Sequence, residues 1–401
     1  MIHHLTYAEA VVVGLFQGVT ELFPVSSLGH SVLIPALVGG SWAQDLSVTA
    51  PNSPYLAFIV GLHVATAIAM IIYFWRDWLR IIGGFFSSIR DRRIETVEQR
   101  LAWMIILGTI PVGIVGALLQ HTVQKTFAKP VVVAVFLAIN GLILFGGERL
   151  RRRQAAGELA DGTAGYADYE DYADEDPALA RSGRDPRYGP GYGDPQYPDS
   201  RYGDPRYGDP RYDETRVDGP PYRDVGVEET RIDGPRWDEP RRGRPAGPRH
   251  SAPARGQRAL KEQEANEGIE ADQRLVRLGY GRAIFLGSLQ ILALLPGISR
   301  DGVVMIGGMF RGLPRADAAR FSFLLSAPVI FAAGALKLPD LMGADGAGIR
   351  GQVLVGSIVS GIGAFLALRF LVRYLQDHSR TLTPFAIYCL VVGIGSAIYL
   401  A

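Results

Sequence analysis

The sequence predicts an all-α integral membrane protein with about six transmembrane helices plus two re-entrant helical hairpins in inverted-topology repeats. Three observations indicate this fold: several apolar runs are long enough to cross a bilayer, two further apolar segments are interrupted by proline and polar residues, and these two segments share a motif. The formal net charge of +1 hides a division of the chain, because two apolar ends flank a polar middle. The 41 Lys and Arg are matched by 40 Asp and Glu, and no nucleic-acid-binding motif is present, so no nucleic-acid partner is expected.

Transmembrane helices are predicted where about 20 consecutive residues are mostly apolar, because a helix of that length matches the hydrocarbon core of a bilayer. Glycine is frequent in some of these runs and permits close packing of helices in lipid. The runs are residues 54–75, 101–120, 130–148, 318–338, 351–373 and 382–400. They divide the chain into two membrane halves, residues 1–148 and 277–401.

The first hairpin is predicted at residues 8–40, whose central stretch reads GLFQGVTELFPVSSLGH. Gln17 and Glu21 lie four residues apart and therefore project from one face of a helix. Pro24 ends that helix, since its ring clashes with the preceding turn and it has no N–H to donate. A carboxylate inside a membrane segment is costly and usually faces a partner or a wet cavity, so Glu21 indicates a functional site.

The break at Pro24 places hydroxyl groups and free backbone N–H groups at the start of a second short helix. Ser26, Ser27 and Gly29 lie in this break, and the apolar sequence resumes at His30. The N-terminus of a helix binds anions, and phosphate above all. The first hairpin is therefore predicted to contact a phosphate group.

The second hairpin is predicted at residues 280–312, where GSLQILALLPGISRDG repeats the pattern G-x-x-Q, an apolar turn, then P-x-x-S. Gly14, Gln17, Pro24 and Ser27 correspond to Gly287, Gln290, Pro296 and Ser299, with one residue of slack. Interrupted apolar segments at matching places in two halves are typical of inverted repeats, whose site lies where the segments meet. The second copy adds Arg300, a planar cation suited to bidentate binding of phosphate.

With these motifs the sequence resembles the undecaprenyl pyrophosphate phosphatase family of the bacitracin-resistance type. The resemblance rests on Gln17 and Glu21, on PVSSLGH at Pro24–His30 and on PGISRDG at Pro296–Gly302, and it covers both apolar halves but not the middle. It implies a membrane hydrolase that converts undecaprenyl pyrophosphate to undecaprenyl phosphate and phosphate. Such an enzyme recycles the carrier lipid for peptidoglycan synthesis, and so bears on cell wall biogenesis, cell shape and bacitracin resistance.

Two alternatives stay open from the sequence. Paired hairpins in inverted repeats also occur in transporters, so the chain could be a translocase for a polyprenyl phosphate or a phospholipid. It could also be a non-catalytic paralogue of the same fold. Release of phosphate from the pyrophosphate lipid separates the phosphatase from both.

Four residues are the candidate catalytic groups under this resemblance. Ser27 is the candidate nucleophile, with Glu21 or His30 handling the proton. His30 could instead take the phosphoryl group itself, and the sequence leaves this choice open. Arg300 would neutralise charge on the phosphate. His63, on the first predicted span, is interpreted as a helix-packing residue.

Other motif residues are predicted to bind the substrate: Gln17, Ser26, Gly29, Gly297, Ser299 and Gly302. A divalent cation, Mg²⁺ or Ca²⁺, is expected beside the phosphates, with Glu21, Gln17 and Asp301 as candidate ligands. Asp301 stands where the family usually has serine, and Val303 and Val304 stand where it has a small residue and a threonine.

Basic residues predict the orientation of the spans, because loops rich in Lys and Arg stay in the cytoplasm. Arginines crowd the loop after the first span and follow the third and fifth spans, whereas residues 121–129 contain only Lys125 and Lys129. Both termini are therefore expected on the outer side of a bacterial plasma (inner) membrane. The first hairpin then enters from outside and the second from inside, as an inverted repeat requires.

Residues 149–276 are predicted to be a disordered cytoplasmic insertion, because Arg, Asp, Gly, Pro and Tyr dominate and too few aliphatic residues remain to bury a core. A short repeat, RYGDPRYGDPRYDE, occupies Arg201–Glu214, and a short helix is predicted within residues 256–275. The sequence leaves open whether the insertion binds a cytoplasmic partner and whether the chain forms a homodimer.

Overall fold

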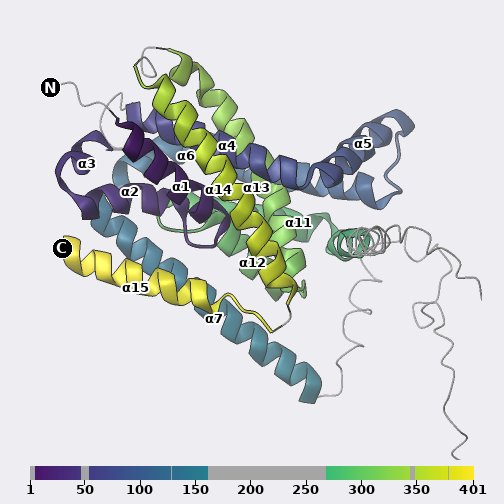
Figure 1. Ribbon diagram of the computed structural model, residues 1–401. Coiled ribbons are helices and arrows are strands. Elements are labelled where there is room, and N and C mark those ends of the chain that lie inside the picture. Colours follow the sequence, from purple (N-terminus) through teal and green to yellow (C-terminus); the bar gives the residue numbers. More distant parts are fainter. Residues whose placement is uncertain (1–4, 47–53, 128, 161–267, 344–347, 378) are drawn as a thin grey trace, which may run out of the picture. The chain divides into compact units, whose positions relative to one another are not determined.

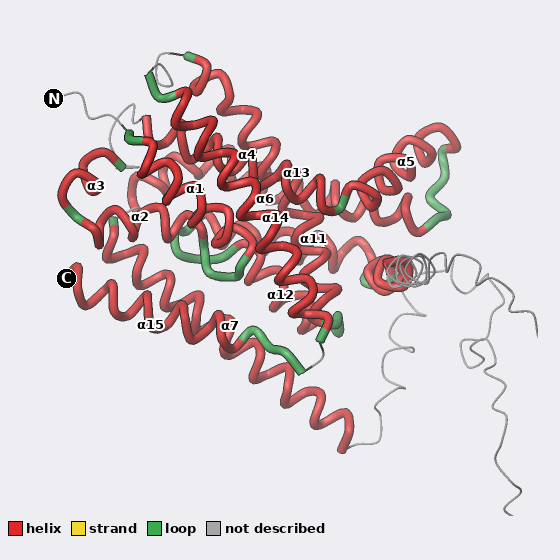
Figure 2. The backbone as a smooth tube through the Cα atoms, in the orientation of Figure 1, coloured by secondary structure: helices red, strands yellow, loops and turns green. Residues whose placement is uncertain are grey.

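The computed structural model describes residues 5–46, 54–127, 129–160, 268–343, 348–377 and 379–401. In this part of the chain helices alternate with short loops and there is no strand (Figure 2). The described residues belong to one compact unit that the two ends of the chain build together, residues 1–179 and 260–401. The all-α prediction is confirmed, while most of the predicted insertion lies outside the described residues.

The helices follow one another as the hairpin motifs predict, with short helices before and after each break (Figure 1). The first half contains α1 (Tyr7–Leu22), α2 (Ser27–Val38), α3 (Gly40–Asp45), α4 (Pro54–Tyr73), α5 (Trp75–Asp91), α6 (Val97–Phe127) and α7 (Pro130–Ala160). The second half contains α11 (Gly279–Leu289), the 3₁₀ helix η1 (Gln290–Leu294), α12 (Arg300–Phe310), α13 (Arg315–Met342), α14 (Arg350–Gln376) and α15 (Thr383–Leu400).

Five of these helices, α6, α7, α13, α14 and α15, are long and apolar enough to cross a membrane. A sixth span results if α4 and α5 count as one, since the two helices are joined with a bend of 84°. The prediction of about six transmembrane helices is therefore confirmed.

Helix α5 corrects the sequence analysis, which treated the residues after the first span as a loop. Its buried residues are Ile81, Gly84 and Ser88, spaced so that they share one face of the helix. This face packs on α6, where Trp103 donates its indole N–H to the Ser88 hydroxyl at 3.0 Å. The charged residues within α5, three arginines and two aspartates, led the sequence analysis to treat this segment as a loop.

The first helix of each hairpin packs on a span from the other half of the chain. Helix α1 packs along α14, and α11 packs along α6. At the first crossing a Cβ added to Gly14 would lie 2.5 Å from the Gly356 carbonyl oxygen, so the backbones touch directly. Gly287 of α11 meets the backbone of Gly108 of α6 in the same manner. The two halves are therefore interlocked through equivalent glycine contacts.

Helix also occupies both edges of the predicted insertion. Helix α7 continues past residue 148 to Ala160, and residues 268–276 are helical, in agreement with the short helix predicted there. This second edge is attached to α13 by two ion pairs at 2.5 Å, Arg274 to Asp317 and Arg320 to Asp272. The chain is thus fixed in place immediately before the second hairpin begins.

Two glycines of α15 offer a matched test of the close packing. A Cβ at Gly393 would lie 2.5 Å from the Ala138 nitrogen of α7, whereas a Cβ at Gly395 would meet nothing within 4 Å. We expect Gly393→Ala to lower the free energy of unfolding by about 1–3 kcal/mol through overpacking. Gly395→Ala should be neutral or stabilising by up to ~1 kcal/mol, because alanine favours the helix. Thermal unfolding of both variants in detergent measures the difference, and equal stability would contradict the packing.

Candidate active site

The breaks of the two hairpins meet through the side chain of Ser26. This residue precedes α2 with a left-handed φ of 68°, and its hydroxyl accepts the Gly29 N–H at 3.3 Å as a helix cap. The same hydroxyl accepts the Gly297 N–H from the second hairpin at 3.2 Å. Gly297 has a φ of 112°, a conformation that needs glycine. Ser26, Gly29 and Gly297 therefore form the junction of the hairpins, and the phosphate contacts predicted for them stay a prediction.

Asn140 of α7 closes the junction from the other side. Its amide nitrogen donates to the Pro24 carbonyl at 2.9 Å, and its amide oxygen accepts the Ser299 N–H at 2.9 Å. The Ser299 hydroxyl in turn caps α12 by accepting the Gly302 N–H at 3.1 Å. Asn140 is fully buried. The sequence analysis missed it, although a polar side chain within an apolar span was the available signal.

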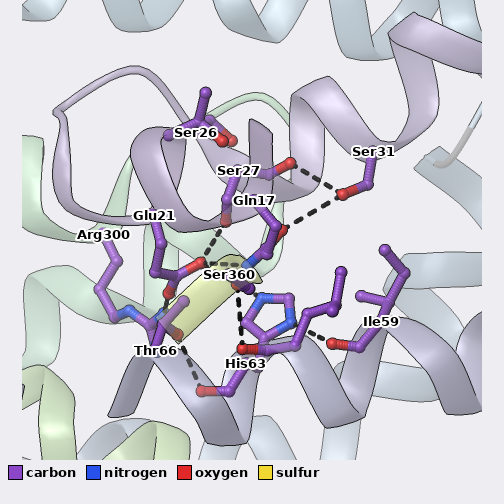
Figure 3. Close-up of polar contacts among 12 residues, drawn as sticks. Gln17, Glu21, Ser26, Ser27, Ser31, Ile59, His63, Thr66, Arg300 and Ser360 are labelled. Carbon is purple, nitrogen blue, oxygen red and sulfur yellow. Dashed lines mark hydrogen bonds and ion pairs between the residues drawn. The ribbon is translucent and has the colours of Figure 1, made fainter. Parts of the chain in front are cut away.

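Glu21 is the centre of the polar site, and Figure 3 shows side chains from three other elements directed at it. Gln17 donates its amide N–H to Glu21 at 2.8 Å, as the spacing of four residues predicts. The Ser27 hydroxyl donates to the same carboxylate oxygen, Oε2. Arg300 of the second hairpin donates to Oε1 at 2.6 Å. The structure thus brings together three of the four predicted catalytic residues.

His63 of α4 is the residue that the sequence analysis placed wrongly. It was interpreted as a packing residue, yet its Nε2 lies 3.3 Å from Glu21 Oε2. Its Nδ1 lies 2.8 Å from the Ile59 carbonyl oxygen one turn earlier, which fixes the direction of the ring. An ionisable side chain within a span was the signal for a functional residue.

His30, the fourth predicted catalytic residue, is directed away from Glu21. Its Nδ1 lies 2.7 Å from the Ser26 carbonyl oxygen and its Nε2 lies 2.8 Å from the Tyr388 hydroxyl of α15, so both ring nitrogens are engaged. It still lines a small cavity that Gln17 and Ser27 also reach. This cavity has room for about one water molecule, with a volume near 10 Å³.

Asp301 lies near the site but has partners of its own. Its Oδ1 accepts the hydroxyl groups of Ser322 at 2.7 Å and Ser326 at 2.6 Å, both on α13. Val303 and Val304, the other departures from the motif, are buried in the apolar core. Asp301 therefore has protein partners on α13, and its role as a metal ligand with Glu21 and Gln17 stays a prediction. Among the described residues no group of three or more His, Cys, Asp or Glu is placed to hold a metal ion.

Comparison with known proteins adds a family to this geometry. The profile described as "Bacitracin resistance protein BacA" matches residues 10–167 and 258–395. An undecaprenyl-diphosphatase of Mycolicibacterium paratuberculosis is 47% identical, covering 100% of this chain and 99% of the relative. Undecaprenyl-diphosphatase 1 of Frankia casuarinae is 49% identical over 97% of this chain and 96% of its own. Undecaprenyl-diphosphatase 2 of Burkholderia orbicola is 31% identical over 96% and 93%.

Replacing Asn140 tests whether the hairpin junction holds the site together. We expect Asn140→Ala to cost about 2–4 kcal/mol of stability, since two buried hydrogen bonds are lost and the Pro24 carbonyl and Ser299 N–H lose their partner. Asn140→Asp keeps the shape and the acceptor for Ser299 but cannot donate to Pro24 when ionised, so it should also destabilise. Thermal unfolding and limited proteolysis in detergent measure both variants. Wild-type stability of both would show that the junction does not depend on Asn140.

Proposed function

The chain belongs to the bacitracin resistance protein BacA family, and from this membership and the site we infer that it is an undecaprenyl-diphosphatase. It is a membrane hydrolase that converts undecaprenyl pyrophosphate to undecaprenyl phosphate and phosphate, and so serves peptidoglycan synthesis. The observation that carries the assignment is the contact of Ser27 and Arg300, from opposite halves of the chain, with the one carboxylate of Glu21. Phosphoryl transfer needs such a combination of a nucleophile, a proton acceptor and a cation.

The terminal phosphate of the substrate fits where the two hairpin breaks meet. Ser27 is the first residue of α2 and Arg300 is the first residue of α12, so two helix N-termini with partial positive charge lie at this place. Arg300 donates to Glu21 through Nη2. Its Nε is buried and has no hydrogen-bond partner among the described residues. That N–H is a donor left for a phosphate oxygen.

Ser27 is the nucleophile in the reaction we propose. Its hydroxyl proton moves to Glu21 Oε2, to which it already donates, as the Oγ attacks the terminal phosphorus. The bond from phosphorus to the bridging oxygen breaks, and its electron pair leaves with the lipid phosphate. Water then attacks the phosphoserine, the bond from phosphorus to Ser27 Oγ breaks, and Glu21 returns its proton to that oxygen. The water protons leave with inorganic phosphate, and Ser27 and Glu21 are restored. His30 supports Ser26 and the cavity wall in this scheme and does not take the phosphoryl group.

A divalent cation is part of the proposal, and one ion with few protein ligands fits the site. Mg²⁺ commonly binds through one or two carboxylates together with substrate phosphates, so Glu21 would hold such an ion together with the pyrophosphate. When bound, the ion would neutralise the charge of the pyrophosphate. The roles of Ser27, Glu21 and Arg300 in the reaction do not depend on which divalent ion is bound.

The location is proposed as a bacterial plasma membrane with both termini outward and residues 149–276 in the cytoplasm. The distribution of arginines supports this orientation. The lipid tail would extend sideways into the bilayer while the head group reaches the hairpin junction. Partners beyond the polyprenyl pyrophosphate and the bilayer are not needed for this function.

Phosphate release from undecaprenyl pyrophosphate by detergent-purified protein tests the function. We expect Ser27→Ala to lower kcat ~10³-fold or more with little change in substrate binding, because binding depends on Arg300 and the helix N-termini.

Arg300→Lys should weaken both substrate binding and the rate of phosphate release, since the planar guanidinium fork is lost. Chelation should abolish the activity and Mg²⁺ should restore it. Ser288→Ala is the matched control, because that hydroxyl donates within its own helix to the Ile284 carbonyl at 2.8 Å. No release by folded wild-type protein under any metal condition would overturn the assignment.

The orientation is tested by cysteine labelling in cells. Cys389 is buried and is the only cysteine, so Cys389→Ser gives a clean background. We expect Gly208→Cys, outside the described residues, to react with an impermeant maleimide only after the membrane is opened. Asn52→Cys should react in intact cells. The reverse pattern would invert the proposed topology.

A further inference from the structure

A groove outside the polar site runs along the last three turns of α14 and the residues that follow it. Its volume is about 440 Å³, which is in the range of sites that hold a small molecule. Leu366 and Phe370 line the end of the groove that lies within the span, and Arg380 lines the end beyond it. The groove therefore joins an apolar end to a charged end along one helix.

Arginines give the groove its charge. Arg369 and Arg373 are four residues apart and exposed, so they project from one side of α14. Arg380 is compensated, because its Nε donates to Asp377 at 3.3 Å. Among the residues that the structure describes, neither Arg369 nor Arg373 has an acidic partner. Two positive charges thus remain for an anion.

The depth of Arg369 in the membrane indicates which kind of anion this is. The span of α14 ends at Gln376, so Arg369 lies seven residues, or about 10 Å, before that end. Leu366 and Phe370 beside it are 59% and 54% exposed, as side chains that face lipid tails are. A charged group in contact with hydrocarbon is costly, and arginine relieves this cost by reaching toward the head groups. A lipid phosphate is the anion that a bilayer supplies at this level.

The wall of the groove is ordered before a ligand arrives. The rings of Phe370 and Tyr374 stack with their centroids 5.8 Å apart, and the Tyr374 hydroxyl donates to the Thr381 carbonyl oxygen at 3.0 Å. The Arg380 guanidinium lies over the Tyr374 ring, 5.6 Å from its centroid. Aromatic and basic side chains gather in this way at the boundary between hydrocarbon and water. The aromatic wall can thus receive an acyl chain beside the charged end.

We propose that this groove binds an anionic phospholipid, with its phosphate between the two uncompensated arginines and an acyl chain along Leu366 and Phe370. A soluble anion would leave the apolar end of the groove unused. In the orientation proposed above, the groove faces the cytoplasmic leaflet, whose anionic lipids are attracted to basic pockets at helix ends. The groove shares no lining residue with the polar site around Glu21, so this inference does not rest on the proposed reaction.

Native mass spectrometry of the detergent-purified full chain tests the site by counting bound lipids during a titration. Phosphatidylglycerol should bind to one saturable site about 10-fold more tightly than phosphatidylcholine with the same acyl chains, because only phosphatidylglycerol carries a net charge. The double variant Arg369→Gln with Arg373→Gln should weaken phosphatidylglycerol binding roughly 10–100-fold and leave phosphatidylcholine binding unchanged.

Arg149→Gln with Arg153→Gln is the matched control. These two arginines are also exposed and four residues apart, on the part of α7 that the orientation places on the same side of the membrane, but they do not line the groove. The control should keep the wild-type affinity for phosphatidylglycerol. Equal weakening in both double variants would show a general attraction to positive charge and would overturn the proposal.

A photoactivatable phosphatidylglycerol maps the site on the wild-type chain, so this result does not depend on the folding of a variant. After irradiation in nanodiscs, the label should lie within residues 362–377. Label found only elsewhere, equal binding of the two phospholipids, displacement by millimolar inorganic phosphate, or tighter binding of undecaprenyl phosphate in the same groove would each reject the proposal. None of these measurements needs turnover, so phosphatidylglycerol binding by a protein that releases no phosphate would retain this inference and reject the proposed function.

Discussion

The hydrogen bonds that join the two hairpin breaks are the constraint on which the site depends. The Ser26 hydroxyl oxygen accepts N–H groups from both hairpins, and Asn140 spans from the Pro24 carbonyl to the Ser299 N–H. Each break exposes backbone groups that would be costly inside a membrane, and the other break or α7 satisfies them. The same contacts fix Ser27 and Arg300 one residue away from the junction. The hydrogen bonds that satisfy the backbone groups of the two breaks therefore also assemble the site.

Interlocking of the halves makes this assembly rigid. Each hairpin begins with a helix that lies against the opposite half, at Gly14 on Gly356 and at Gly287 on Gly108. Close backbone contact leaves little freedom for either helix to slide, so the donors around Glu21 are held in place before a substrate arrives. Preorganised donors of this kind stabilise developing charge without having to reorient during the reaction. The same glycine contacts therefore stabilise the fold and hold the donors around Glu21 in position.

Local signals allowed much of this to be predicted from the sequence, and tertiary contacts account for what was missed. Pro24 and Pro296 interrupt helices by their own chemistry, and Gln17 with Glu21 share a face by spacing alone. The contact of His63 with Glu21 was missed because Glu21 lies more than 40 residues earlier in the chain, and no local pattern links the two residues. The contacts of Asp301 with Ser322 and Ser326 of α13 could not be predicted, because no local pattern places α13 beside it. Helix α5 was missed because its arginines were used to assign orientation and the segment was therefore treated as a loop.

The ion pairs that attach residues 268–276 to α13 have a consequence for how the chain can evolve. Arg274 and Asp272 hold the returning chain at Asp317 and Arg320, so the second half is positioned by its own contacts and does not rely on the residues before it. The entropy of closing a connection grows only slowly, by about 0.6 kcal/mol for each doubling of its length. Lengthening, shortening or rewriting the segment between Ala160 and these ion pairs is therefore nearly free of cost to folding, and that stretch can diverge among relatives while the hairpins stay fixed.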